Sequence, residues 1–436
     1  MSKAREDAKA IFRVSSGNFL EMYDFAVYGF YAAFIAKIFF PAENEFLSIM
    51  QSFLAFGVGF LMRPLGAIVL GGYMDKYGRK KGLLVTLTLM AIGTLTIALC
   101  PGYESIGVLA PIIVVIGRLL QGFSAGAEVG GASVYLAEIA PKHLRGFYVS
   151  WQSGSQQVAT IFAGAIGVGL HYWIGDAIME AWGWRIPFII GCLVVPFIFY
   201  IRRTLEETPE FEAKKHHAPK TFAAIFKNMA ENFPVIIAGV FFVMMTTVTF
   251  YFVTSFTPHF ASNILNFTKL EAFIVTAIVG VSNLFWLPVS GFVGDKIGRK
   301  KVALFMTFLG MISAYPMLGW LAGMAESGTL TFGKFVVVEL WFSFIFGGYN
   351  GAMVCALSEI MPKHVKALGF SFSYSITVAI FGGFTPAVST FLTKYTGNPA
   401  SPALWLTFAA ICSFIASVII FRRGGFYDRQ QQGEHQ

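Results

Sequence analysis

Apolar stretches of membrane-spanning length run along nearly the whole of this 436-residue chain. Apolar side chains make up 56% of the sequence and charged ones only 13%, which is about half the charged share of a soluble domain. The 47 Phe residues also exclude a disordered chain, because disordered segments are poor in aromatic residues. Since one bilayer crossing takes about 20 apolar residues, the length allows roughly a dozen crossings and no large soluble domain.

The apolar pattern predicts twelve helical spans. They lie near 14–40, 47–73, 83–101, 106–136, 147–173, 185–203, 235–261, 271–294, 302–323, 331–357, 367–393 and 402–421. The segment 204–234 is the longest polar stretch and separates six spans from six. We therefore expect an all-α membrane protein with one six-helix bundle in 1–203, a central loop in 204–234, and a second bundle with a short tail in 235–436.

The basic residues mark one side of the membrane. Seven clusters hold 25 of the 32 Lys and Arg residues, and these clusters occupy both ends of the chain and every second gap between spans. This is the positive-inside pattern, so both termini, the central loop and the tail are predicted to be cytoplasmic. Because topology accounts for the net charge of +8, no nucleic-acid partner is expected.

Two further patterns narrow the class of protein. No short apolar core with a small-residue cleavage site follows the basic start, so 14–40 is expected to remain as the first span. The four cysteines lie far apart and lack metal-ligand spacing. We expect no metal site and no cofactor.

Glycines at a spacing of four in the fourth span, Gly122, Gly126 and Gly130, are typical of close helix packing. No strand pattern precedes them, and the sequence contains no Walker lysine motif. We therefore expect no nucleotide-driven transport.

The loop after the second span recurs after the eighth. Residues 71–81 read GGYMDKYGRKK and residues 291–301 read GFVGDKIGRKK, at an offset of 220. A second pair, 138–143 and 359–364, repeats the pattern Glu-Ile-x-Pro-Lys-His at an offset of 221. Matching loops at matching points of the two halves indicate a duplicated six-span unit.

The shared pattern Gly-x-x-x-Asp-Lys-x-Gly-Arg-Lys-Lys resembles the signature of the major facilitator superfamily. Loops that served only as topology signals would need neither the glycine nor the aspartate. The resemblance implies two pseudo-symmetric six-helix bundles. It also implies gating latches on the cytoplasmic side, formed by Asp75, Arg79, Glu138, Arg145, Asp295, Arg299 and Glu359.

Four other segments are similar to the metabolite:proton symporter family within that superfamily. They are 16–25 (SGNFLEMYDF), 63–66 (RPLG), 118–122 (RLLQG) and 182–188 (WGWRIPF). The segments 150–157, 341–344 and 349–353 look most like those of citrate and tricarballylate proton symporters.

This resemblance implies a secondary transporter that imports a tricarboxylate, citrate or tricarballylate, with protons by alternating access. It also implies a monomeric, multi-pass protein of the bacterial inner membrane, whose partners are the substrate, protons and the lipid bilayer. The alternative is a proton symporter for a dicarboxylate or another small metabolite, because such relatives share the framework. A membrane-embedded enzyme or sensor is a more remote alternative.

Few charged residues fall inside the predicted spans, where an ionised side chain costs about 2.5–3.5 kcal/mol. Arg118, halfway along the fourth span, is the first choice for a substrate carboxylate, because guanidinium binds carboxylate bidentately. A structural ion pair is its alternative role. Arg63 and Glu339 are expected to be charge partners or substrate contacts. Glu21 and Asp24 share one helix face and are candidate proton-coupling sites, with Asp24 preferred, or else fixed partners for an arginine.

Neutral polar residues complete the expected cavity. Besides Arg118, the expected substrate-binding residues are Asn18, Tyr31, Gln152, Ser155, Gln156, Tyr251, Asn283, Trp286, Tyr349 and Asn350, and Thr246, Thr247 and Thr249 enrich the seventh span. For any single member, an interhelical hydrogen bond is an equal alternative. Glu128 is expected to be an interhelical brace and His259 an interfacial histidine.

Overall fold

The computed structural model describes residues 3–77, 79–126, 128–203, 229–362 and 366–433. All regular structure in these residues is helical, and they contain no strand. Helices suit this sequence because a helix satisfies its own backbone hydrogen bonds, which lipid cannot do. The prediction of an all-α fold is confirmed.

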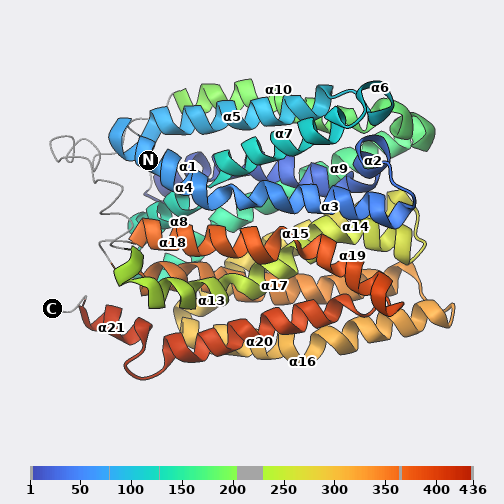
Figure 1. Ribbon diagram of the computed structural model, residues 1–436. Helices are drawn as coiled ribbons and strands as arrows, with labels where there is room; N and C mark the ends of the chain where they lie inside the picture. The colour runs from blue at the N-terminus through green and yellow to red at the C-terminus, as the bar shows by residue number, and fades with distance from the viewer. Residues whose placement is uncertain (1–2, 78, 127, 204–228, 363–365, 434–436) are drawn as a thin grey trace.

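The long helices run side by side, with the first half of the chain next to the second (Figure 1). Both ends of the described chain lie at the same end of the bundle (Figure 1). We call that end the terminal face and the opposite end the distal face.

The helices of the two halves follow each other with short connections. The first half contains α1 (Lys3–Phe30), α2 (Ala32–Phe39), α3 (Glu45–Leu61), α4 (Arg63–Tyr77), α5 (Arg79–Leu99), α6 (Tyr103–Ile106), α7 (Leu109–Ala125), α8 (Glu128–Ile139), η1 (Lys142–Leu144), α9 (Arg145–Ile178), η2 (Met179–Gly183) and α10 (Arg185–Arg203). The second half contains α13 (Phe233–Tyr251), η3 (Phe252–Phe256), α14 (Thr257–His259), η4 (Phe260–Ile264), α15 (Lys269–Ile297), α16 (Arg299–Glu326), α17 (Phe332–Ile360), α18 (Lys366–Thr377), η6 (Val378–Gly382), α19 (Thr385–Thr396), α20 (Pro402–Phe421) and α21 (Phe426–Gly433).

Helices occupy all the predicted span positions. Among the described residues, nine helices are long and apolar enough to cross a bilayer. The bent pair formed by α1 and α2 supplies a tenth span. Two shorter apolar helices, Leu84–Leu99 and Arg185–Tyr200, fall on the predicted third and sixth spans.

Several predicted spans are bent or interrupted rather than straight, and the eleventh, for example, contains the π-helical turn η6 between α18 and α19. The first, expected over 14–40, turns by 65° between Asn18–Phe30 and Ala32–Phe39. The seventh, expected over 235–261, changes from α-helix to π-helical turns at η3 and η4, with α14 between them. Pro258 near the start of α14 accounts for part of this break, because proline lacks a backbone N–H and clashes with the preceding turn. Such π turns are frequent at functional sites.

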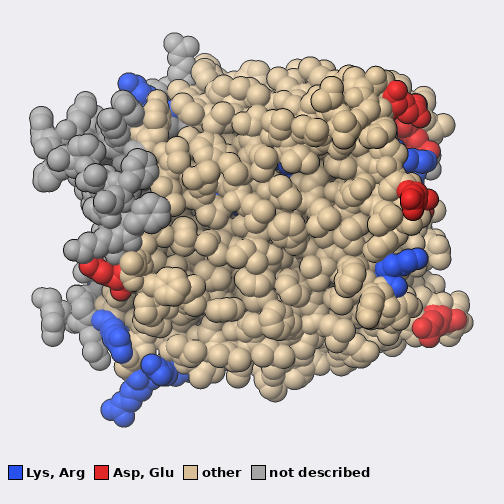
Figure 2. Space-filling model, in the orientation of Figure 1, with Lys and Arg blue, Asp and Glu red and all other residues tan. Residues whose placement is uncertain are grey.

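Apolar side chains cover the sides of the molecule. Leu99 and Leu193, for example, are each 70% exposed. In the view of Figure 2, charged side chains gather at the terminal and distal faces, and the band between them is almost free of charge. An apolar band between two charged ends is the surface that a bilayer-spanning protein presents.

Helices of both halves meet along one surface, which we call the seam. There α9 packs along α15, α3 packs against α19, and α1 packs against η3. Because elements of both halves line it, a group bound in the seam contacts both halves at once.

Glycines bring the second and fourth spans into backbone contact. A Cβ built on Gly122 would lie 1.6 Å from Gly59 O, and one built on Gly126 would lie 2.0 Å from Arg63 O. Gly130 approaches the second half of the chain just as closely. These contacts agree with the close-packing role that the spacing predicts.

Gly122→Ala is expected to destabilise the fold, because its methyl group has no space beside Gly59 O. Overpacking typically costs about 1–3 kcal/mol, so the melting temperature in detergent should fall by several degrees. Gly319→Ala is the matched control, since a Cβ at that helical glycine would meet nothing within 4 Å. Equal melting temperatures for the two variants, measured by intrinsic fluorescence on heating, would contradict the packing role.

Candidate functional site

A small cavity lies in the seam. Its lining residues are Met22, Arg63, Gln156, Thr246, Thr247, Phe250, Tyr251, Phe346, Asn350, Tyr374 and Val378. The void measures about 10 Å³, which is about the room that one water molecule needs. Both halves therefore close tightly around one arginine and a set of hydroxyl and amide groups.

Arg63 supplies the positive charge of this cavity. It begins α4, and its side chain is 4% exposed. Its Nη2 donates to Glu21 Oε1 at 2.5 Å, and its guanidinium lies 4.9 Å from the ring centres of Phe25 and Phe60. The Nε group has no hydrogen-bond partner among the described residues. Arg63 is thus ion-paired and still has a donor to offer to a ligand.

Arg118 is held in an aromatic cage and does not border the cavity. Its guanidinium lies 4.5 Å from the ring centre of Phe25 and 4.6 Å from that of Tyr28, and two further Phe rings complete the cage. Its Nη1 donates to Gln121 Oε1 at 2.6 Å. The sequence ranked Arg118 above Arg63 as the substrate contact, on its position along the span. In this conformation Arg63 lines the cavity and Arg118 does not, because the Arg118 guanidinium lies among the aromatic rings. The substrate contact of either arginine stays a prediction.

Glu21 and Asp24, which share one face of α1, differ in their partners. Glu21 pairs with Arg63. Asp24 accepts a hydrogen bond from the Thr94 hydroxyl at Oδ2, and its Oδ1 has no partner among the described residues. Gln121 Nε2 in turn donates to Thr94 Oγ1 at 3.0 Å. Asp24 is therefore buried with the Thr94 hydroxyl as its hydrogen-bond partner. Thr94 and Gln121 link it by hydrogen bonds to Arg118 in the aromatic cage.

The other predicted binding residues fall into two groups. Gln156, Tyr251 and Asn350 line the cavity together with Thr246 and Thr247. The second group lies outside the cavity lining and consists of Asn18, Tyr31, Gln152, Ser155, Asn283, Trp286 and Tyr349.

Members of the second group bond or pack between helices, which is the alternative role for such residues. Asn283 Nδ2 donates to Gln157 Oε1 across the seam at 2.9 Å. Tyr349 donates to Phe242 O at 2.6 Å. Trp286 packs edge-on against a neighbouring Phe ring of α17.

The rest of this group also lies outside the cavity lining. Ser155 donates to Gln152 O within its own helix, and Tyr31 packs against Phe273 across the seam. Asn18 is buried, with no hydrogen-bond partner for its Nδ2 among the described residues.

Three residues near the cavity were not predicted. Ser153 Oγ lies 3.1 Å from Gln152 Oε1 and 3.4 Å from Asn350 Oδ1 and can donate to either, so it lies between polar groups of the two halves. The sequence could have indicated Ser153, because it lies in the polar segment 150–157. Met22 and Tyr374 line the cavity, but as apolar and aromatic residues in apolar spans they carry no signal in the sequence.

Contacts across the seam close the terminal face at positions predicted to form latches. Asp295 accepts from the backbone N–H groups of Gly146 and Phe147 at 2.8 and 3.0 Å. These groups belong to the first turn of α9, so a carboxylate of the second half caps a helix of the first. Arg299 holds Asp295 at 3.0 Å and Glu359 at 2.9 Å.

One further ion pair joins the halves at this face, between Arg145 and Glu359 at 3.6 Å. The side chains of Asp75, Arg79 and Glu138 lie outside the described part of the structure, so their latch roles stay predictions. We call the described contacts of Asp295, Arg299, Arg145 and Glu359 the terminal latch.

A second set of contacts, the distal latch, closes the opposite face. Lys269 donates to Glu180 Oε1 at 2.7 Å, and Lys37 lies 3.6 Å from the same carboxyl group. Asn263 donates to Glu45 Oε1 at 3.1 Å. The hydrogen bond from Lys269 holds the pKa of Glu180 below its usual range, so this pair stays ionised at neutral pH and weakens as the pH falls through the lowered pKa. With both latches made, the structure is an occluded conformation.

Three other titratable residues differ in their surroundings. Glu128 accepts from Thr86 at 2.9 Å, as expected for a brace. His259 is buried edge-on against Phe53, so it packs inside the protein, and its position at the membrane interface stays a prediction. The break in the seventh span places it inside the protein. Glu339 is fully buried and does not line the cavity.

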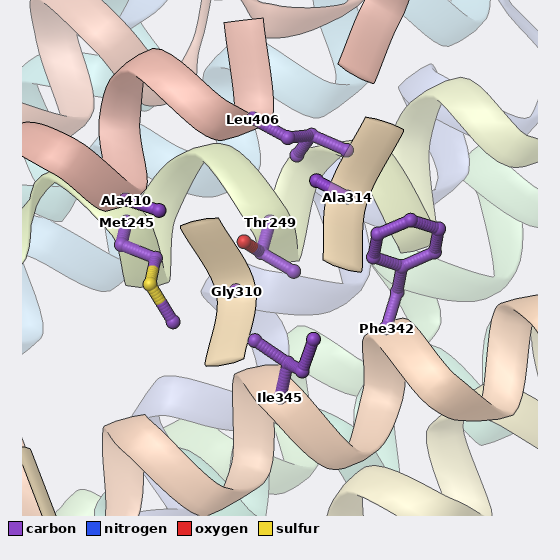
Figure 3. A pocket seen from close by; sticks show the side chains of 8 residues that line it. All are labelled: Met245, Thr249, Gly310, Ala314, Phe342, Ile345, Leu406 and Ala410. Atoms are coloured by element: carbon purple, nitrogen blue, oxygen red, sulfur yellow. The ribbon is translucent and has the colours of Figure 1, made fainter. Parts of the chain in front are cut away.

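A second void lies within the second half. Figure 3 shows its lining, which consists of Met245, Thr249, Gly310, Ala314, Phe342, Ile345, Leu406 and Ala410. Thr249 contributes the only hydroxyl group of this lining, and the other lining residues are apolar and uncharged.

A family model settles the class of the chain. The model described as "Sugar (and other) transporter" matches residues 10–227 and 212–423. The chain belongs to the major facilitator superfamily. The expected major facilitator fold and a transport function, rather than an enzymatic one, are confirmed.

Curated relatives and solved structures agree with this assignment. The chain is 53% identical to a "Citrate-proton symporter" of Salmonella typhi, over 95% of this chain and 94% of that protein. It is also 53% identical to one of Klebsiella pneumoniae, over 95% and 92% of the two chains. These relatives support the predicted location as a multi-pass protein of the bacterial inner membrane.

Among solved structures, a D-xylose-proton symporter matches with a TM-score of 0.71 at 19% identity, over 95% of this chain and 97% of that one. A partially occluded inward-open form of a xylose transporter from E. coli matches with a TM-score of 0.73 at 19% identity, over 94% and 96%. At this identity the two structures support the fold alone.

Asp295→Asn is expected to open the terminal face more often, because it removes the charge that caps α9. Hydrogen bonds to a charged group contribute about 1.5–3 kcal/mol each, so the open fraction should rise by about tenfold or more. Cys355, fully buried beside Arg299, should then react faster with N-ethylmaleimide, as followed by peptide mass spectrometry. Lys301→Gln, which removes a charge at an exposed position near the start of α16, is the control. Unchanged Cys355 reactivity in Asp295→Asn would count against the latch.

Proposed function

We propose that this chain is a citrate–proton symporter that works by alternating access. The identity of 53% to two proteins of that name supports the proposal. The observation that carries it is Arg63, a buried cation with a spare Nε–H at the wall of a cavity that both halves line. A guanidinium binds a carboxylate through two parallel hydrogen bonds.

Donors from both halves are available to the carboxylates of citrate. Arg63 and Gln156 come from the first half, and Thr247, Tyr251 and Asn350 come from the second. A ligand that bonds to both halves favours the conformation in which they are close together. Substrate binding therefore stabilises the occluded form.

The charge of the cavity gives a physical reason for proton coupling. Glu21 already neutralises Arg63, so the cavity has little net positive charge to offer to a trianion. An uncompensated charge inside the bilayer is costly. Protons bound by the protein or by the substrate supply the missing compensation.

Asp24 is the preferred coupling site of the two acids on α1. Glu21 stays ionised in its direct ion pair with Arg63, whereas Asp24 has a hydroxyl group as its hydrogen-bond partner and feels Arg118 only from a distance. Burying a carboxylate without a direct ion pair is costly, so Asp24 binds a proton when the site closes. Gln121 and Thr94 connect this proton to Arg118, which in this conformation acts on the coupling proton rather than on the substrate.

The transport cycle then follows from the two latches. The positive-inside rule puts the terminal face in the cytoplasm, so the distal face is periplasmic. Opening of the distal latch admits substrate and protons, and their binding restores the occluded form. Rupture of the terminal latch, with loss of the proton from Asp24, releases both to the cytoplasm.

Citrate and tricarballylate share three carboxyl groups, and the same donors serve either substrate. A dicarboxylate symporter is the second candidate, because a single arginine faces the cavity. Competition by mono-, di- and tricarboxylates against labelled citrate separates the two. We also propose a monomeric transporter, since one chain supplies all the lining residues.

Uptake into proteoliposomes tests the function directly. Labelled citrate should accumulate when the outside is made acid relative to the inside, and a protonophore should abolish that accumulation. Liposomes without protein are the control. Citrate entry that no pH gradient accelerates would overturn the symport.

Arg63→Lys is expected to weaken citrate binding by at least about tenfold, because lysine keeps the charge but loses the bidentate fork. Arg118→Lys is the matched comparison and should change citrate affinity less, since Arg118 is caged away from the cavity. Isothermal titration calorimetry in detergent gives the citrate dissociation constants of both variants. A larger loss of affinity in Arg118→Lys would restore Arg118 as the substrate contact.

A further inference from the structure

Glu339 lies on the face of α17 that packs against the broken seventh span. Phe335 and Phe342, four residues before it and three after it, share that face. Phe335 contacts Phe260, and Phe342 contacts Phe252. The Glu339 carboxyl is thus enclosed among phenyl rings, and the residue is fully buried.

A single hydroxyl group reaches this carboxyl. Thr257 Oγ1 lies 3.1 Å from Glu339 Oε2 and also 3.1 Å from Phe252 O. A hydroxyl group carries one hydrogen, and a carbonyl oxygen can only accept. If Thr257 donates to the carbonyl, the carboxyl must donate to Thr257, and it can do so only when protonated.

The other oxygen of Glu339 leads to the same conclusion. Oε1 has no hydrogen-bond partner among the described residues, and no Lys, Arg or His of the described chain forms an ion pair with the carboxyl. A buried carboxylate without a cation or a second donor is costly. A protonated Glu339 removes that cost in the occluded conformation.

Asp24 in the first half has the same arrangement. Its Oδ2 meets the Thr94 hydroxyl, which also lies 3.0 Å from the carbonyl oxygen of Met90, and its Oδ1 has no partner among the described residues. Each half therefore contains a buried acid that a threonine hydroxyl links to a backbone carbonyl.

The segment that contacts Glu339 also seals the distal face. Ser255 lies so close to α1 that a Cβ on Gly29 would be 2.8 Å from it. His259 packs on Phe53 of α3, and Asn263 bonds to the first half at Glu45. Thr257 lies between these contacts, so the state of Glu339 affects the part of the seventh span that closes the seam.

The titratable groups of the elements around Glu339 leave it without a charged neighbour. On the broken span the nearest is His259, whose ring faces Phe53 and whose Nδ1 has no partner in the described chain. On α13 the one titratable side chain is Tyr251, which lines the seam cavity. The acids and bases of α15 and α16 lie near the ends of those helices, and Tyr315 of α16 is 46% exposed.

We propose that Glu339 is a second proton-binding site, and that a proton on Glu339 is required for the seventh span to seal the distal face. The inference rests on the proton symport proposed above and adds a site in the second half of the chain. Outward opening admits water to the carboxyl and lets it ionise. A proton from the periplasm then restores the neutral form that the closed packing needs, so low pH favours the sealed conformation.

The proposal can be tested without any substrate, by measuring how readily a reagent from the periplasmic side reaches the seam at the distal face. A cysteine introduced as Ser255→Cys lies under the seal, where Ser255 is fully buried. This cysteine is alkylated with a membrane-impermeant maleimide in right-side-out vesicles at pH values between 5.5 and 9. The alkylation rate, measured by peptide mass spectrometry, reports how often the distal face opens. Rates are divided by those of the reference Ala42→Cys, an exposed position in the connection between α2 and α3 at the distal face, which corrects for thiol ionisation.

With Glu339 present, the corrected rate should be low at acid pH and rise about tenfold or more toward alkaline pH. The comparison is made in an Asp24→Asn background, which removes the other buried acid. In that background Glu339→Gln, which mimics the neutral form, should hold the rate low at every pH, whereas Glu128→Gln, a matched change of an acid in the first half, should keep the rise. A rise that persists with Glu339→Gln, or that disappears equally with Glu128→Gln, would overturn the proposal.

Thr257→Val provides a second, independent test, through the direction in which it shifts the pH midpoint of the rise in alkylation rate. If Glu339 donates to Thr257, loss of the hydroxyl weakens the protonated form and moves the midpoint of the rise to lower pH, by about half a unit to one unit. A shift to higher pH would show that Thr257 donates to an ionised Glu339 and would contradict the proposal. Neither test uses citrate, so either result stands apart from whether citrate is the substrate.

Discussion

The cost of burying charge in a bilayer governs the arrangement of the polar groups in this transporter. The structure uses three solutions. Glu21 and Arg63 form an ion pair, and the Arg118 guanidinium lies among aromatic rings with Gln121 as its acceptor. Asp24 and Glu339 form no direct ion pair in the described chain and each has a hydroxyl group as its hydrogen-bond partner, so a bound proton is the remaining solution for these two acids. Proton coupling thus follows from which buried acids lack a direct ion pair.

Much of the fold could be predicted from the sequence. Apolar length fixed the spans, and the repeated loops indicated two related halves, because both signals depend on local residue type. The breaks at Tyr31 and in the seventh span could not be read in the same way. Pro258 marks the second break, but the π turns on each side of it depend on packing against the first half, which a local pattern does not contain.

The candidate site was predicted less completely. Residue type and depth singled out Arg63, Gln156, Tyr251 and Asn350 as polar groups in apolar spans, and these line the cavity. The same reasoning ranked Arg118 first, because position along a span says nothing about which way a guanidinium turns. Rotation about the helix axis decides between a cavity and an aromatic cage, and it is set by neighbours on other spans.

The helix pair α9 and α15 connects the two latches mechanically. Asp295 near the end of α15 caps the start of α9, while Lys269 at the start of α15 holds Glu180 just beyond the end of α9. Between these points the two helices touch closely, since a Cβ on Gly280 would lie 2.8 Å from Ile161. Because α9 and α15 touch near their middles, this contact acts as a pivot. Separating the two helices at one end brings them closer together at the other end. Simultaneous opening of both faces, and the proton leak that it would cause, is therefore opposed by the shape of this pair.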